Sequence, residues 1–155
     1  MSTFYVSKPI TDALLDSLRD DYPAYLKTIG TSAKMRLDVP KTIKLSDDYE
    51  AVGLERPVVL VSPVSATIED EAVGVVSVKI LFEVVFVIDG LKEDDATTKA
   101  MLYADALVGM VTDDDYLGGA VTHASVPRTE YYPGGTQTAR YALSDVEITL
   151  EVNRS

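Results

Sequence analysis

The run Val78-Lys79-Ile80-Leu81-Phe82-Glu83-Val84-Val85-Phe86-Val87-Ile88 carries the clearest structural signal in the chain. Every second residue in it is large and apolar, and side chains alternate between the two faces of a β-strand. The even-numbered residues therefore share one face, which we expect to be core. The odd-numbered residues mix Lys79 and Glu83 with apolar residues, and this face is expected to meet solvent or a partner. We predict a long strand over residues 74–88.

Two amphipathic helices are predicted, one before and one after the first two strands. The first spans residues 8–21 and the second residues 95–111, because each carries an apolar stripe at helical spacing. Ser7 is suited to cap the first helix, and Pro23 is expected to end it. A short turn is expected to continue over residues 25–30. The stripes consist of Ile10, Ala13, Leu14 and Leu18 in the first helix and Ala100, Ala104, Leu107 and Val111 in the second.

Three further strands are predicted over residues 57–69, 120–132 and 140–152. They are rich in β-branched residues, and the last alternates cleanly between apolar and polar positions. Pro63 has no N–H to donate, which indicates a sheet edge or a bulge at that position. The acidic triplet Glu69-Asp70-Glu71 is expected to form a loop. Tyr132-Pro133-Gly134-Gly135 is expected to form the hairpin turn between the last two strands.

The predicted fold is therefore α+β, with elements in the order α-β-β-α-β-β. A four-stranded, mainly antiparallel sheet is expected to pack both helices on its one apolar face. The chain of 155 residues has the size of one domain, and we treat 1–155 as a single domain. Residues 31–56 show only rough alternation, interrupted by Pro40, and are expected to form an extended arm or a loose hairpin.

Composition limits the classes to which the protein can belong. The chain has no cysteine, which excludes disulfides, thiolate metal sites and cysteine nucleophiles. Lys79 and Glu83 interrupt the longest apolar run, so we expect no membrane span, and residues 1–10 lack the apolar core of a signal peptide. The net charge of −11 repels the phosphates of DNA. Tight wrapping of nucleic acid by this surface is therefore not expected.

The residues that could carry chemistry do not form a recognisable catalytic motif. His123 is the single histidine and falls in the middle of a predicted strand, away from any serine or cysteine motif. Asp113-Asp114-Asp115 lacks the alternate spacing and the later glutamate of a calcium loop. Gly118-Gly119 and Gly134-Gly135 lack the context of a phosphate loop and are expected to be turns. We therefore predict no enzyme activity, no cofactor, and no catalytic, cofactor-binding or metal-ligating residue.

Three local features carry a resemblance to a known family. They are the helix Ile10-Thr11-Asp12-Ala13-Leu14-Leu15-Asp16-Ser17-Leu18, the step Asp115-Tyr116-Leu117-Gly118-Gly119-Ala120-Val121 and the acidic-apolar strand from Asp145 to Val152. In this order, with two long strands between the helices, they resemble the tail-terminator (tail-completion) and related neck proteins of long-tailed bacteriophages. The resemblance implies a structural virion protein without enzymatic activity. Such a protein would cap the tail tube and join the tail to the head connector as a hexameric ring.

The resemblance also implies a set of partners. These are other copies of the chain, the tail-tube protein and the head connector or stopper protein, with no membrane contact. DNA would pass through the ring without specific binding, because acidic residues on the lumen side would repel it. The long strands would extend the sheet or reach the next subunit, and residues 31–56 would form an arm to the tail tube or connector. The implied location is the neck or tail of the virion, after assembly in the host cytoplasm.

Two other functions are compatible with the pattern. One is another neck component, a head-completion or connector protein, which differs in its partner. The other is a small α+β ligand-binding or enzyme domain, which needs polar groups that converge on a pocket. Its candidate residues are His123, Arg128, Tyr131 and Arg140. Pairing of the last two strands is expected to bring Arg128 near Arg140.

Overall fold

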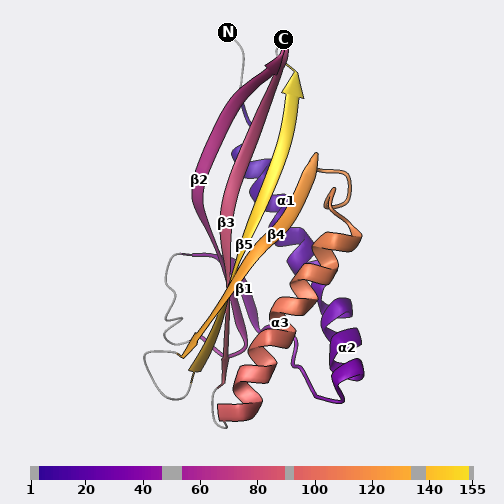
Figure 1. The fold of residues 1–155 in the computed structure, drawn as a ribbon, viewed down its shortest axis with the longest axis vertical. Helices are drawn as coiled ribbons and strands as arrows, with labels where there is room; N and C mark the ends of the chain where they lie inside the picture. Colours follow the sequence, from indigo (N-terminus) through magenta and orange to yellow (C-terminus); the bar gives the residue numbers. More distant parts are fainter. Residues whose placement is uncertain (1–3, 47–53, 90–92, 134–138, 154–155) are drawn as a thin grey trace.

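The computed structural model describes residues 4–46, 54–89, 93–133 and 139–153, arranged as a layer of helices on one face of a twisted sheet (Figure 1). The helices are α1 (Ser7–Asp20), α2 (Tyr22–Ala33) and α3 (Glu93–Asp113). The strands are β1 (Thr42–Leu45), β2 (Val58–Ala72), β3 (Val75–Asp89), β4 (His123–Pro133) and β5 (Ala139–Asn153). The α+β class predicted from the sequence is confirmed.

The sheet has five strands in the order β1-β2-β3-β5-β4, with β1 parallel to β2 and the other neighbours antiparallel. The prediction of a four-stranded sheet is wrong, because β1 arises from the segment expected to be an arm or hairpin. This strand pairs over only four residues, from Thr42↔Val58 to Leu45↔Val61, and Ile43 packs on the core. A single core side chain is too short a pattern to indicate a strand in the sequence.

The helical layer has three members rather than the two predicted, because the chain turns almost directly from α1 into α2. Pro23 does not end the helical region. It falls in the first turn of α2, where a missing N–H leaves no helical hydrogen bond unmade. The start of the 31–56 segment completes α2, which is followed by Lys34 in a left-handed conformation. In the described part of the chain, no helix is long and apolar enough to cross a membrane.

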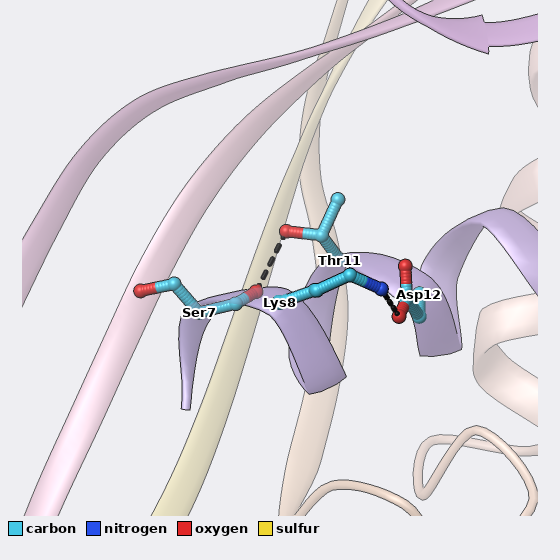
Figure 2. A network of polar contacts seen from close by, with 4 residues as sticks. All are labelled: Ser7, Lys8, Thr11 and Asp12. Atoms are coloured by element: carbon cyan, nitrogen blue, oxygen red, sulfur yellow. Dashed lines mark hydrogen bonds and ion pairs between the residues drawn. The ribbon is translucent and has the colours of Figure 1, made fainter. Parts of the chain in front are cut away.

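The first turn of α1 is held by its own side chains (Figure 2). Val6 rather than Ser7 occupies the N-cap position, so the predicted Ser7 cap is wrong. The Ser7 carbonyl instead accepts a hydrogen bond from the Thr11 hydroxyl at 2.8 Å. The Lys8 ammonium forms an ion pair with Asp12 at 2.6 Å, at the i, i+4 spacing that stabilises helices. Both contacts stabilise the first turn, but neither involves its N–H groups, and α1 has no side-chain cap.

The main core lies between the helices and the sheet, and β3 forms its centre. The even-numbered residues from Val78 to Ile88 are all buried, as predicted. Phe86 stacks on Tyr22 of α2, with ring centroids 5.6 Å apart, and also packs against Tyr103 of α3. The Tyr22 hydroxyl donates a hydrogen bond to the Tyr103 carbonyl at 2.7 Å, which satisfies its buried polar end. These aromatic contacts fasten α2 and α3 to the sheet.

The opposite face of the sheet has two different halves. Near β1 it carries a second buried cluster, which includes Val85 and Val87 and packs against Leu54. The prediction that this face meets solvent or a partner is wrong for these two valines, which are fully buried. Farther along β3 the face is charged, with Lys79 exposed and Glu83 partly exposed. The second buried cluster, on the half of this face near β1, consists of Val58, Leu60, Val85, Val87, Ala139 and Tyr141.

Strands β2 and β3 form a long hairpin that extends past the helical layer (Figure 1). The prediction of a loop at Glu69-Asp70-Glu71 is wrong, since these residues continue β2. The chain reverses at Val73-Gly74, where Gly74 has a φ of +83° that glycine adopts without strain. The pairing with β3 shifts register between Pro63 and Ser65, at the proline where a sheet edge or a bulge was predicted.

Candidate functional site

The two arginines considered for a ligand pocket lie apart. Both belong to the β4–β5 pair, but Arg128 is opposite Asp145 and Arg140 is opposite Pro133. Positions 140 and 145 are five positions apart along β5, with four residues between them. Arg128 also forms an ion pair with Glu130. The prediction that strand pairing brings Arg128 close to Arg140 is therefore wrong.

His123 and Tyr131 lie at separate places on β4. The His123 ring is more than half exposed, and its Nδ1 is 3.2 Å from a carboxylate oxygen of Asp115, after the end of α3. Tyr131 lies farther along the strand, where burial and then the Asp105 carboxylate raise the pKa of its hydroxyl. With the arginines, these side chains are spread along the β4 side of the sheet rather than around one site. The polar groups expected for a ligand pocket do not converge.

The Asp113-Asp114-Asp115 triplet ends α3 at Asp113, and its last two residues build a tight turn with the glycines that follow. An Asp114 carboxylate oxygen accepts a hydrogen bond from the Gly118 N–H at 2.8 Å. Gly118 and Gly119 have φ values of +72° and +87°, which confirms the turn predicted there. The other predicted glycine turn, Gly134-Gly135, lies outside the described residues. Within the described ranges, no group of three or more His, Asp and Glu residues is placed to hold a metal ion.

An acidic surface occupies the middle of the sheet face that points away from the helices. Glu83 on β3 lies directly opposite Asp145 on β5. Glu147 follows on the same face of β5, and Glu130 on β4 faces the same side. Burial and then the neighbouring Glu83 raise the pKa of the Asp145 carboxyl, and Arg128 offsets this in part. We call Glu83, Glu130, Asp145 and Glu147 the acidic face.

The chemistry open to the acidic face is electrostatic. Like charges directly opposite each other in a sheet destabilise it, so the Glu83–Asp145 pair works against folding. Arg128 and Lys79 lie on this face too, but the four carboxylates outnumber them, so the face keeps a net negative charge that repels polyanions such as DNA. This surface is therefore suited to face nucleic acid without binding it.

The far end of the β2–β3 hairpin is exposed. All ten residues from Pro63 to Ala72 are exposed. Strand β1 pairs only with Val58–Val61, so beyond that point the outer edge of β2 has no neighbouring strand among the described residues. We call residues 68–73 the hairpin tip. It combines two large apolar residues, Ile68 at 60% exposure and Val73 fully exposed, with three acids between them.

A groove runs between α2 and the segment that follows it, residues 34–39. Its volume is about 640 Å³, and most of its lining is apolar, including Leu26, Leu37 and Val39. The charged residues that line it in the described structure are all basic: Lys27, Lys34 and Arg36. We call it the basic groove. It lies at the end of the molecule away from the hairpin tip (Figure 1).

Three local features build the basic groove. A Cβ on Gly30 would lie 2.8 Å from the Met35 carbonyl oxygen, so glycine is what lets the segment fold back this closely. Lys34 follows α2 with a φ of +55°, and its N–H bonds back to helix carbonyls. The Tyr103 hydroxyl donates a hydrogen bond to the Asp38 carbonyl and ties the segment to α3. The groove is therefore a fixed part of the fold.

The basic groove was not predicted from the sequence, although the distribution of charge along the chain contains a usable signal. Between positions 27 and 44, Asp38 is the single acid. The same stretch holds five of the 14 Lys and Arg residues: Lys27, Lys34, Arg36, Lys41 and Lys44. The whole chain carries −11, so this stretch is basic within an acidic protein. Such separation of charge is a reason to look for a binding surface.

No protein-family model and no curated protein matches the chain. Among solved structures, a chain from the virion of a native gene transfer agent particle is similar, with a TM-score of 0.56 and 16% sequence identity. The similarity covers 97% of this chain and 100% of that chain. At this identity the likeness establishes a common fold.

Proposed function

We propose that the protein is a structural component of a phage-like virion that acts at the neck, where it caps the tail tube and joins the tail to the head connector. One observation carries the proposal: the fold matches a chain of a gene transfer agent virion over 97% of this chain and 100% of the other. Fold alone does not determine function. The surfaces of this chain must therefore suit the role as well.

The described surfaces suit a ring through which DNA passes. In a hexameric ring, the acidic face would line the lumen and repel DNA, which would cross without specific binding. The hairpin and the basic groove would remain for contacts with neighbouring copies, the tail-tube protein and the connector or stopper protein. The role is non-enzymatic and needs no cofactor. The protein would be assembled into the virion neck in the host cytoplasm.

Deletion of the gene from its source genome tests the neck role. We expect DNA-filled heads without attached tails and tails of irregular length in electron micrographs, with normal particles restored by the intact gene. A tagged chain should appear between head and tail in cryo-electron microscopy of purified particles. Normal particles made without the chain would overturn the proposal.

Co-purification separates the tail-terminator role from that of another neck component. A tail terminator is expected to co-purify with the tail-tube protein when the two are co-expressed. A head-completion or connector protein would instead co-purify with the portal. Recovery with the portal alone would move the protein to the head side of the neck.

Charge reversal tests the lumen role of the acidic face. The variant E83K/D145K is expected to assemble into particles that deliver DNA less efficiently, because cations would then line the path of the phosphates. The variant D16K/D20K changes the charge equally on an exposed face of α1 and should deliver DNA normally. Equal delivery by both variants would show that the acidic face does not meet DNA.

A further inference from the structure

Two exposed features of this chain are complementary to each other. The hairpin tip is apolar at both ends, at Ile68 and Val73, and acidic between them. The basic groove has an apolar lining, and its charged lining residues in the described structure are all basic. The two features lie at opposite ends of the molecule, so one chain cannot bring its own tip to its own groove (Figure 1).

We propose that the hairpin tip of one copy docks in the basic groove of a second copy. The inference rests on the proposed ring and names the contact that holds neighbouring copies together. Ile68 and Val73 cover the apolar lining, which removes their side chains from water. Glu69 and Glu71, which lie between them, meet Lys27 and Lys34 at the rim.

The positions of the two surfaces determine the symmetry of the assembly. A contact between two different patches is heterologous, and repeated head-to-tail contacts close into a ring when the rotation between copies allows it. A tip and a groove at opposite ends of one chain provide such a pair of patches. A two-fold dimer would instead need one patch that is complementary to itself.

The groove is formed before any partner arrives, which lowers the cost of docking. Gly30 allows the close approach of the segment, and the Tyr103 hydroxyl holds it to α3. Arg36 is already paired with Asp38 at 3.0 Å. The contact with an acidic partner is therefore placed on Lys27 and Lys34.

If a second copy of the chain occupies the basic groove, the same contact accounts for both the exposed groove and the exposed hairpin tip. An exposed strand with an open edge and apolar residues at its end promotes aggregation unless a defined partner covers it. The tip is acidic and therefore complementary in charge to the basic groove. Each copy of the chain carries both surfaces, so copies can contact one another repeatedly. Another virion protein with an acidic, apolar segment is the competing occupant, and it predicts a different pattern of crosslinks.

Cysteine crosslinking tests the contact directly, because the natural chain has no cysteine. Full-length V73C and V39C variants, mixed and mildly oxidised, are expected to give a disulfide-linked dimer in higher yield than either variant alone. V73C mixed with V108C, which places the second cysteine at an exposed valine of α3, is the matched control. Equal yields from the two mixtures would overturn the proposal. So would particles in which V39C links to a different virion protein.

Charge reversal provides a second test, read as the mass of the full chain by light scattering over a range of concentrations. E69K/E71K and K27E/K34E should each weaken self-association by more than about tenfold, because like charges then meet across the contact. A mixture of the two variants should restore it, since the lysine tip of one meets the glutamate groove of the other. D16K/D20K, with the same charge change as the tip variant, should associate as the natural chain does.

Two outcomes would overturn the docking contact. One is a natural chain that stays monomeric at every concentration, and the other is association that neither reversal weakens. The gene-deletion phenotype tests the neck role separately. If gene deletion gave detached heads and tails but the charge-reversal variants associated as the natural chain does, the docking contact would be refuted and the neck role would still be supported.

Discussion

The two ends of the β2–β3 hairpin place the same strands in opposite environments. At its base, the run Val58-Val59-Leu60-Val61 is buried between the helical core and the second cluster. Toward its tip, every residue of β2 from Pro63 onward is exposed. A strand covered on both faces needs consecutive apolar residues, whereas a free one does not. The base therefore holds the stability of the fold, and the tip is available for assembly.

Phe86→Ala should break the base and have the largest effect on stability. Phe86 is 1% exposed and contacts both Tyr22 and Tyr103. Loss of the ring leaves a cavity and should lower the free energy of unfolding by about 3–5 kcal/mol, measured by urea denaturation. Ile68→Ala at the tip is the comparison and should change stability by less than about 0.5 kcal/mol. Equal losses at both positions would contradict the division between base and tip.

Gly30→Ala should have the next largest effect, at the groove. The added Cβ would lie 2.8 Å from the backbone oxygen of Met35, and we expect a loss of about 1–3 kcal/mol in thermal unfolding. Gly109→Ala in α3 is the matched control, because its Cβ would lie 3.5 Å from Tyr25, an ordinary contact. Alanine should stabilise that helix by about 0.5–1 kcal/mol. If both variants lost similar stability, the close contact between position 30 and the Met35 carbonyl oxygen would not be the cause of the loss in Gly30→Ala.

The base of the sheet could be predicted from the sequence, and the surfaces could not. The alternation over 78–88 is long enough to define a strand and its core face. At Glu69-Asp70-Glu71 the strand is exposed on both faces, so burial imposes no alternation and the acids resemble a loop. The Glu83–Asp145 pair depends on the register of two strands that are distant in sequence, which single-strand patterns do not contain.

Tyr103→Phe should cause a smaller loss, because it removes one hydrogen bond and keeps the aromatic packing. The lost bond is the one from the Tyr103 hydroxyl to the Asp38 carbonyl, and its removal should cost about 0.5–1.5 kcal/mol in urea denaturation. Burial raises the pKa of this hydroxyl, so the group stays a neutral donor near neutral pH. The loss should therefore be the same at about pH 6 and about pH 8. A loss that changed over this interval would need another cause.

The smallest effect on stability is expected at the Glu83–Asp145 pair, where the outer face of β3 changes from buried valines to charged residues. Burial and then Glu83 raise the pKa of Asp145, so the folded state binds this proton more tightly than the unfolded chain does. The free energy of unfolding therefore falls as the pH rises from the ordinary value of 3.8 through the raised pKa. Asp145→Asn should remove this fall and gain less than about 1 kcal/mol at neutral pH, because the carboxyl keeps contact with water. Urea denaturation from about pH 3 to about pH 7 measures the difference.

Glu71→Gln is the control, because it removes the same charge at the hairpin tip and should leave the pH dependence of unfolding as it is in the natural chain. If the Asp145→Asn and Glu71→Gln variants gave identical pH profiles, Glu83 and Asp145 would not repel each other in the folded protein.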